Sequence, residues 1–237
     1  MSEKIGRSTI ILNNKPAITG YGSVVGIEEY NGPIGKEFDH FDKDCRFGED
    51  TFEKAESRMQ KIAMQTAFKR ANISENDIDT VFAGDLLNQC IGSTFCLRNT
   101  GIPFVGLYGA CSTFTLGLAL SSLLVDNKVL KRTMTITSSH FCSAERQYRF
   151  PLEYGCVRPQ TSQRTVTAAG ATVIENADNK PYIDSVCLGF VEDMGVKDAN
   201  NMGAAMAPVS VKLRPYPVPK LRRYASVFHH TKRQSER

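Results

Sequence analysis

The sequence predicts an α/β protein, and three observations carry that prediction. Short β-rich segments alternate with helical patterns along residues 1–207. One helical pattern is amphipathic, whereas a second is apolar on nearly every face and is therefore expected to be buried in a large protein. Of the 237 residues, 41% are apolar and 23% charged, which allows a core and excludes a disordered chain. Strands separated by helices imply a sheet with covered faces.

The first elements are two short strands followed by a long helix. Residues 8–12 and 17–25 are β-rich, and residues 31–48 form a polar loop that contains glycine. The helix is predicted over residues 51–71, where apolar residues recur at spacings of three and four: Phe52, Ala55, Met59, Ile62, Ala63 and Ala67. Asp50 or Thr51 is suited to cap this helix. Glu53 and Glu56 fall in its first turns, where the helix dipole favours anions.

The remaining pattern continues the alternation. A second helix is expected over residues 111–125, which carry no charge. Further strands are expected over residues 78–83, 104–107, 133–137, 165–174 and 182–190. A long loop, which includes Tyr148, Pro151 and Tyr154, separates the third of these strands from the fourth.

An uncharged stretch raises the question of a membrane span. The 27 residues between Arg98 and Asp126 carry no charge. Gly101 and Pro103 interrupt their first half, so a helix that begins near Cys111 reaches about fifteen residues, short of the roughly 20 that a bilayer requires. We therefore expect no transmembrane helix. The amino-terminal residues also lack the apolar segment of a signal peptide.

Charge is distributed unevenly along the chain. The formal net charge is +4, yet residues 208–237 contain eight basic residues and one acidic residue, which makes this segment +7 and residues 1–207 −3. A nucleic-acid-binding protein requires a basic surface on its folded part, and the sequence of residues 1–207 offers none. We expect no nucleic-acid partner.

The cysteines and histidines predict neither a disulfide framework nor a metal site. The seven cysteines form no CxxC pair, and an odd number without a signal peptide is typical of reduced cytosolic thiols. His140 with Cys142, or His40 with Cys45, lacks a second pair at the spacing of a zinc site. We expect no metal and no other cofactor.

The passage around Cys111 holds the strongest functional signal. Residues 105–113 read VGLYGACST: a strand ends, glycines permit a tight turn, and a cysteine stands where a helix begins. Free backbone N–H groups and the helix dipole favour a thiolate there, so Cys111 could attack a carbonyl or accept an acyl group. The same N–H groups could hold a carboxylate ligand. A buried structural cysteine is the third interpretation.

Longer motifs resemble a known family. The turn Gly109-Ala110-Cys111 before an apolar helix resembles the nucleophile elbow of thiolases and ketoacyl synthases, and residues 73–84 (ISENDIDTVFAG) look like the segment that leads into their third strand. Further stretches are similar to the stage V sporulation protein AD family: TSSH at 137–140, QYRFPLEYG at 147–155, RP at 158–159, TVTAAGA at 165–171 and DANNMGAAMAP at 198–208. The resemblance covers most of residues 1–208.

This resemblance implies a thiolase-like fold of layered αβαβα architecture, built from two similar α/β halves with the Cys111 helix buried centrally. It implies a protein that binds dipicolinic acid and acts in dipicolinate uptake into the developing spore and in its release at germination. The implied partners are membrane proteins of the same spore operon, and an intact fold implies a homodimer. The expected location is the soluble compartment or cytoplasmic face of the sporulating cell, peripherally at the spore inner membrane.

Dipicolinate is a flat pyridine with two carboxylates, so its site requires a helix N-terminus or arginines for the anions and an apolar or aromatic wall for the ring. Cys111 and Ser112 offer the helix N-terminus. Arg149 is our candidate among the arginines that lie near aromatic residues in the sequence, and any one of them could equally be a surface or interface residue. His140 follows a strand end, where sites of α/β proteins lie. It is expected either to face Cys111 or to be a structural loop histidine.

The alternative function is a thiolase- or ketoacyl-synthase-like acyltransferase with Cys111 as nucleophile and His140 as the second catalytic candidate. Acyl-transferring members of this superfamily take a His, and a second Cys, Asn or His, from the second half of the chain. Outside residues 209–237 this sequence has only His40 and His140, both in the first half. Without a positioned acid and base, condensation or thiolysis lacks a route for proton transfer, so we expect no enzyme activity.

The resemblance divides the chain into three predicted segments. Residues 1–175 form the first thiolase-like half, residues 176–208 begin the second half, and residues 209–237 form a basic tail with three prolines that is disordered or out of frame. A basic membrane-contacting segment is the alternative for this tail. The second half is thus expected to be largely missing. The apolar surface of residues 116–124 would then lie exposed and favour association.

Overall fold

The computed structural model describes residues 2–148 and 165–189 together with Gly195 and Lys197. The chain divides into two compact units, Met1–Ser2 with Leu12–Asp184, and Glu3–Ile11 with Ser185–Arg237. We describe each unit by itself. The segment boundaries predicted at residues 175 and 208 stay predictions, and the predicted tail lies outside the described residues.

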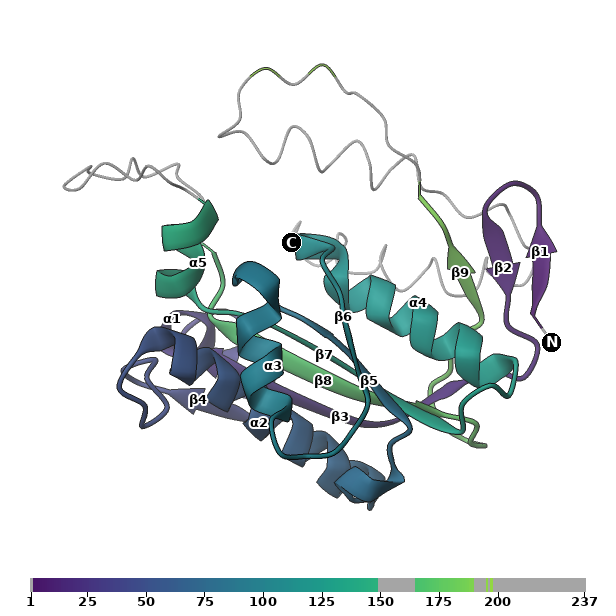
Figure 1. Cartoon of the computed structure of the whole chain (residues 1–237), viewed down its shortest axis with the longest axis horizontal. Coiled ribbons are helices and arrows are strands. Elements are labelled where there is room, and N and C mark those ends of the chain that lie inside the picture. The colour runs from purple at the N-terminus through teal and green to yellow at the C-terminus, as the bar shows by residue number, and fades with distance from the viewer. Residues whose placement is uncertain (1, 149–164, 190–194, 196, 198–237) are drawn as a thin grey trace, which may run out of the picture. The chain divides into compact units, whose positions relative to one another are not determined.

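The larger unit is built on a six-stranded mixed sheet in the order β4-β3-β8-β7-β5-β6 (Figure 1). Its strands are β3 (Ala17–Gly26), β4 (His40–Asp42), β5 (Thr80–Gly84), β6 (Phe104–Gly106), β7 (Arg132–Ser139) and β8 (Ala168–Glu175). Strands β7, β5 and β6 run parallel, and β8 lies antiparallel between β3 and β7. The predicted strands are confirmed, with shorter bounds for β8 than the sequence indicated.

Helices cover both faces of this sheet. Helices α2 (Phe52–Ala71) and α3 (Ile91–Leu97) lie on one face, and α4 (Thr113–Asp126) lies on the other (Figure 1). Two shorter helices, α1 (Ile27–Tyr30) and α5 (Phe141–Tyr148), follow β3 and β7. The α/β class is therefore confirmed, and the helix–sheet–helix layers agree with one half of the expected architecture.

Helix α2 forms where the apolar spacing predicted it. The hydroxyl of Thr51 accepts the Lys54 N–H at 3.3 Å and caps the first turn, while Asn72 ends the helix in the left-handed conformation with φ of 55°. Met59, Ala63 and Ala67 bury the apolar stripe in the main core. Glu53 and Glu56 fall in the first turns of the helix as predicted, and the side chain of Glu56 is fully buried on this stripe.

Helix α4 packs on the sheet through its small residues. Thr113, Gly117 and Ser121 are buried at a spacing of four, and the Ser121 hydroxyl lies 3.1 Å from that of Thr135 on β7. Val125 is also buried, but most of the larger apolar side chains of α4 are only half-buried, and Leu116 is 37% exposed. Within the described structure the helix is therefore only partly covered, although its sequence is apolar on nearly every face.

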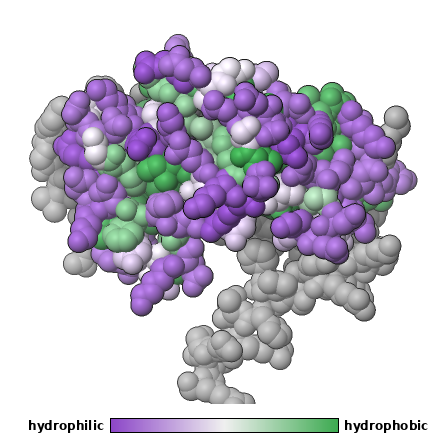
Figure 2. All heavy atoms as spheres, turned by 90° about the horizontal axis from the view of Figure 1, so that it is seen from below, coloured by the Kyte–Doolittle hydropathy of each residue, from purple (hydrophilic) through white to green (hydrophobic). Residues whose placement is uncertain are grey.

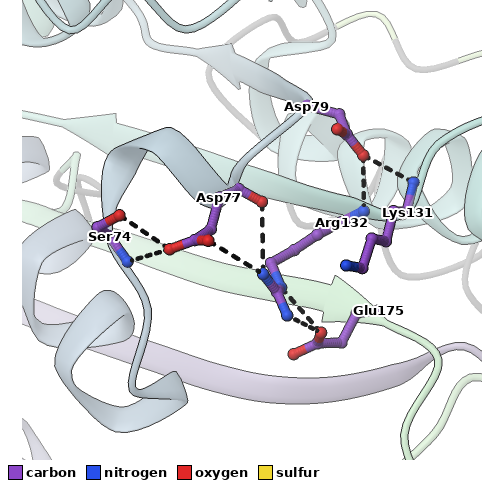
Figure 3. Close-up of polar contacts among 6 residues, drawn as sticks. All are labelled: Ser74, Asp77, Asp79, Lys131, Arg132 and Glu175. Carbon is purple, nitrogen blue, oxygen red and sulfur yellow. Dashed lines mark hydrogen bonds and ion pairs between the residues drawn. The ribbon is translucent and has the colours of Figure 1, made fainter.

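The edge of the sheet where β7 begins is fixed by a polar cluster on Arg132 (Figure 3). The Arg132 guanidinium donates to Glu175 at the end of β8, at 2.5 and 2.8 Å, and lies 4.0 Å from Asp77. Ser74 and Asp77 form a capping box, and the pKa of Asp77 is lowered mainly because its carboxylate accepts the Ser74 N–H. Asp79 accepts the Lys131 and Arg132 N–H groups. This cluster holds the loop before β5 to the start of β7.

The smaller unit contains a three-stranded antiparallel sheet in the order β1-β2-β9. Its strands are β1 (Glu3–Ile5), β2 (Thr9–Ile11) and β9 (Ser185–Cys187). Strands β2 and β9 were predicted as longer strands, and β1 was not predicted.

The surface of the molecule is polar on the side seen from below in Figure 1. Figure 2 shows hydrophilic atoms over most of this face, with hydrophobic atoms in small patches between them. Among the described residues, no helix combines the length and apolar character that crossing a membrane requires. We expected that the uncharged stretch after Arg98 does not form a transmembrane helix, and the described helix of that stretch agrees with this.

The close packing of α4 on the sheet predicts that one methyl group added at Gly117 lowers the free energy of unfolding. A Cβ at Gly117 would lie 2.4 Å from Thr135 Cγ2, so Gly117→Ala should push α4 from the sheet and lower the free energy of unfolding by about 1–3 kcal/mol. Gly170→Ala is the matched control, because a Cβ there meets no atom within 4 Å. Denaturant unfolding of both variants checks this, and equal stabilities would contradict the packing described.

Candidate functional site

Three polar passages meet at one edge of the sheet. Strands β6, β5 and β7 are parallel neighbours, so their carboxyl ends lie along the same edge, where sites of α/β proteins form. Strand β6 leads to Cys111, β5 leads to Asp85, and β7 ends at Ser138 and Ser139 before His140. The candidate site is therefore the carboxyl edge of these three strands.

The turn after β6 is a tight elbow. The Leu107 N–H donates to Ala83 O at 2.8 Å and keeps the turn beside β5. A Cβ at Gly84 would lie 2.3 Å from Leu107 O, so only glycine fits there. The left-handed residue of the turn is Ala110, with φ of 45°, rather than one of the glycines that the sequence pointed to.

Cys111 and Ser112 are exposed on this elbow. They belong to the 3-10 turn Ala110–Ser112, and α4 itself begins at Thr113, so Cys111 lies just before the helix rather than in its first position. The Ser112 hydroxyl donates to Gly109 O at 2.8 Å and forms no cap with the first turn of α4. The Ser112 and Thr113 N–H groups donate to Gly109 O and Ala110 O, so the next N–H groups of the first turn, those of Phe114 and Thr115, are the ones that could receive an anion.

His140 is buried and bonded to the backbone. It is 1% exposed, and its ring lies 4.9 Å from the ring of Phe52. The Cys142 N–H lies 3.2 Å from Nδ1, which must accept it, and Nε2 then donates to Cys45 O at 2.8 Å. No hydrogen bond joins His140 to Cys111, both of which are described residues. Its predicted part in ligand binding stays a prediction.

The other predicted ligand residue, Arg149, lies outside the described residues, as do Arg158 and Arg164. The candidate set of Cys111, Ser112, His140 and Arg149 is thus placed only in part. The structure brings Cys111 and Ser112 together at the elbow after β6, whereas His140 follows β7, from which β6 is separated by β5.

A buried polar network at the same edge was not predicted. The Gln60 amide on α2 donates to Ser93 Oγ at 3.1 Å and to Ser138 Oγ at 2.7 Å. Ser138 donates to Glu56 at 2.8 Å, and Ser93 donates to Asp85 at 2.6 Å. Two carboxyl groups are therefore connected through one amide. The sequence signal that could have revealed this network is that two polar residues of α2, Glu56 and Gln60, lie within its apolar stripe.

Burial dominates the electrostatics of this network. It raises the pKa of Glu56 to about 7, against the opposing hydrogen bond from Ser138, and the nearby Asp85 charge adds to the rise. Cys90, close to the elbow, also has a raised pKa because of burial, and its thiol lies 3.5 Å from Leu107 O. Cys90 is thus a neutral neighbour of the turn.

Two shallow hollows of the described surface lie elsewhere. One, of about 240 Å³, is lined by Phe95, Ile102 and neighbouring residues of α3 and β6, and the other, of about 410 Å³, by Asp39, Lys69 and Arg70 among others. Neither is lined by Cys111, Ser112 or His140. Within the described ranges, no three His, Cys, Asp or Glu side chains are grouped to hold a metal ion.

Glu56 predicts a pH-dependent stability. Its folded-state pKa of about 7 exceeds the ordinary 4.5, so between these values the folded chain binds more protons than the unfolded chain. Stability should therefore fall as pH rises from about 4.5 through about 7, by at most about 3 kcal/mol. Chemical unfolding across this range should show that Glu56→Gln removes this fall. An unchanged slope in the variant would contradict the assignment.

Known proteins similar to this chain agree on its family. Residues 6–215 match the family described as Stage V sporulation protein AD. Stage V sporulation protein AD of Bacillus subtilis (strain 168) is 38% identical over 205 residues, which are 86% of this chain and 61% of that protein. The chain thus spans less than two thirds of that relative's length.

Solved structures that are similar to this chain have low sequence identity to it. The 3-oxoacyl-[acyl-carrier-protein] synthase III of Aquifex aeolicus is 14% identical with a TM-score of 0.42, covering 69% of this chain and 55% of that one. Cerulenin-bound OleA of Xanthomonas campestris is 14% identical with a TM-score of 0.44, covering 68% and 57%. On the match of residues 6–215 and the Bacillus subtilis relative, this chain belongs to the stage V sporulation protein AD family.

Proposed function

We propose that this chain binds dipicolinic acid at the Cys111 elbow without transferring an acyl group, and that it acts in dipicolinate uptake into the developing spore and release at germination. Membership of the stage V sporulation protein AD family supports the sporulation role. The observation that carries the binding site is the exposed elbow, whose helix N-terminus has no side-chain cap.

The ligand's chemistry suits this elbow. One carboxylate would accept N–H groups at the start of α4, where the helix dipole is positive. Tyr108 is 75% exposed in the same turn and offers an aromatic face to the pyridine ring. An arginine, for which Arg149 is our candidate, would pair with the second carboxylate.

The second candidate function is acyl transfer by Cys111, which the exposure of this cysteine favours. Acyl transfer also requires a base within hydrogen-bond reach of the thiol. His140 is bonded to the Cys45 carbonyl and the Cys142 N–H instead, so we favour binding over catalysis.

The proposed partners follow from the family and from the sheet. We propose membrane proteins of the same spore operon as partners, and a peripheral location at the spore inner membrane. We also propose a homodimer. Strand β6 supports it, because it is the last strand of the sheet and Val105 on it is 43% exposed.

Calorimetry with dipicolinate tests the proposed site. Loss of a charge-assisted bond should weaken binding about tenfold or more in Arg149→Ala, whereas Arg58→Ala, an exposed arginine on α2, should bind like the parent chain. Absence of binding to the parent chain, or equal loss in both variants, would contradict the proposal.

Cys111→Ala separates binding from acyl transfer. We expect it to retain dipicolinate binding within a few-fold, because the backbone N–H groups remain. We also expect the parent chain, incubated with an acyl-CoA, to show no adduct on Cys111 by mass spectrometry. An adduct that disappears in Cys111→Ala would support the acyltransferase instead.

A further inference from the structure

Glu56 connects three elements at the carboxyl edge. It lies on α2, it accepts the Ser138 hydroxyl at the end of β7 at 2.8 Å, and it accepts the Ser143 hydroxyl in the first turn of α5 at 3.0 Å. Ser138 and Ser143 stand on either side of His140. One carboxyl group therefore spans residues 138–143, which we call the β7–α5 junction.

The two carboxyl groups of the network are unequally stabilised. Asp85 accepts three donors, namely the Leu87 N–H, the Ser93 N–H and the Ser93 hydroxyl, at 2.6–2.9 Å. Backbone N–H donors stabilise an ionised carboxylate strongly. Glu56 accepts two serine hydroxyls, and the four ion pairs among the described side chains do not include it. Glu56 thus has fewer hydrogen-bond donors than Asp85, and neither of its donors is a backbone N–H.

Two described carboxyl groups act on Glu56 with charges of its own sign. Asp85, after β5, and Glu53, on the same helix, both disfavour its ionised form. On the junction itself the titratable groups are the Cys142 thiol and His140, whose ring nitrogens face the Cys45 carbonyl and the Cys142 N–H. Ser138, Ser143 and Gln60 are neutral. The two hydroxyl groups that contact Glu56, those of Ser138 and Ser143, carry no charge that would offset a buried negative charge.

The neutral form of Glu56 satisfies every group of the junction without moving a heavy atom. Its proton can be donated from Oε2 to Ser143 Oγ, and Ser143 can turn its own proton to His140 O, 3.2 Å away. Oε1 continues to accept the Ser138 hydroxyl. The closed junction is thus fully hydrogen-bonded when Glu56 is protonated.

The ionised form of Glu56 is less well stabilised in the closed junction than the neutral form. It keeps two hydroxyl donors, but it places a second negative charge near Asp85. Water is excluded from this site, because the Glu56 side chain is fully buried. An unpaired buried charge is costly, and hydration relieves that cost. Water can reach Glu56 only if the elements that cover it separate, and the short α5 is one of these elements, joined to Glu56 through the Ser143 hydroxyl.

We infer that Glu56 is a proton-operated latch: with its proton it holds the end of β7 and the first turn of α5 on α2, and release of the proton to solvent loosens the β7–α5 junction. This device does not depend on which ligand the carboxyl edge binds. It makes the segment that leads from β7 into α5 responsive to pH.

Hydrogen exchange followed by mass spectrometry tests the latch on the full chain. In the open junction Glu56 is exposed to solvent and has its ordinary pKa. The equilibrium constant for opening should therefore rise about tenfold per pH unit from about pH 5 to about pH 6.5 and level off above about pH 7. After correction for intrinsic exchange rates, protection of residues 138–144 should follow this course. Amides of β3 should remain more protected throughout.

Two glutamate variants provide the matched comparison. Glu56→Gln keeps the shape of the side chain without the titration, so its protection of residues 138–144 should not change with pH. Glu75→Gln makes the same change at an exposed position and should behave like the parent chain. A pH-independent junction in the parent chain, or an unchanged pH course in Glu56→Gln, would overturn the latch.

A spectroscopic measurement keeps the inference testable if Glu56→Gln does not fold. Infrared spectroscopy of the parent chain should show a protonated buried carboxyl at about pH 6 that is lost above about pH 7. In Ser143→Ala, which removes one arm of the latch, residues 138–144 should lose protection while the infrared signal persists. A carboxyl that stays ionised throughout this range would overturn the inference. Dipicolinate is absent from these measurements, so their failure is distinct from failure of the proposed function.

Discussion

The close approach of α4 to the sheet is the constraint on which the carboxyl edge depends. A side chain at Gly117 would meet Thr135 on β7, and a side chain at Gly84 would meet both Leu107 O and Thr113 Cγ2, the latter at 2.6 Å. The absence of Cβ atoms at these positions lets the turn after β6 fold back directly over the end of β5. The elbow residues Cys111 and Ser112 are consequently presented at the end of a helix whose small face is buried.

The carboxyl edge combines an open and a closed polar region. At the elbow, backbone donors and an exposed thiol are accessible, which suits recognition of a small anion. Beside it, Glu56 and Asp85 are enclosed between α2, α3 and the strand ends and are bridged through Gln60. The open region underlies the proposed binding function, and the closed region underlies the inferred latch on the segment after β7.

Periodicity predicted the elements with long, regular patterns. Helix α2, its Thr51 cap and the central strands were found because apolar spacing and β-branched runs follow the geometry of the backbone. Helix α3 was missed, since it has seven residues and includes Gly92, Ser93 and Thr94, which are weak helix formers. Strand β4 has three residues in a polar loop, too few for a pattern.

The candidate site was predictable only where a motif marks it. Cys111 was found from the strand–turn–helix pattern, but the left-handed position at Ala110 depends on the turn geometry and not on glycine content. The burial of Glu56 was not predicted, because helix-dipole reasoning concerns its place in the first turns and not the direction in which tertiary packing turns its side chain. The partners of His140 come from residues distant in sequence, such as Cys45, which a single sequence does not reveal.

The central claim is that the elbow after β6 binds a small dicarboxylate through the amino-terminal end of α4. Titration of isotopically labelled chain with dipicolinate, followed by backbone amide chemical shifts, tests it most directly. The account predicts saturable shifts concentrated at residues 109–115, with the strands on the far side of the sheet unchanged. Saturable shifts confined to another part of the chain, or none at all, would contradict it.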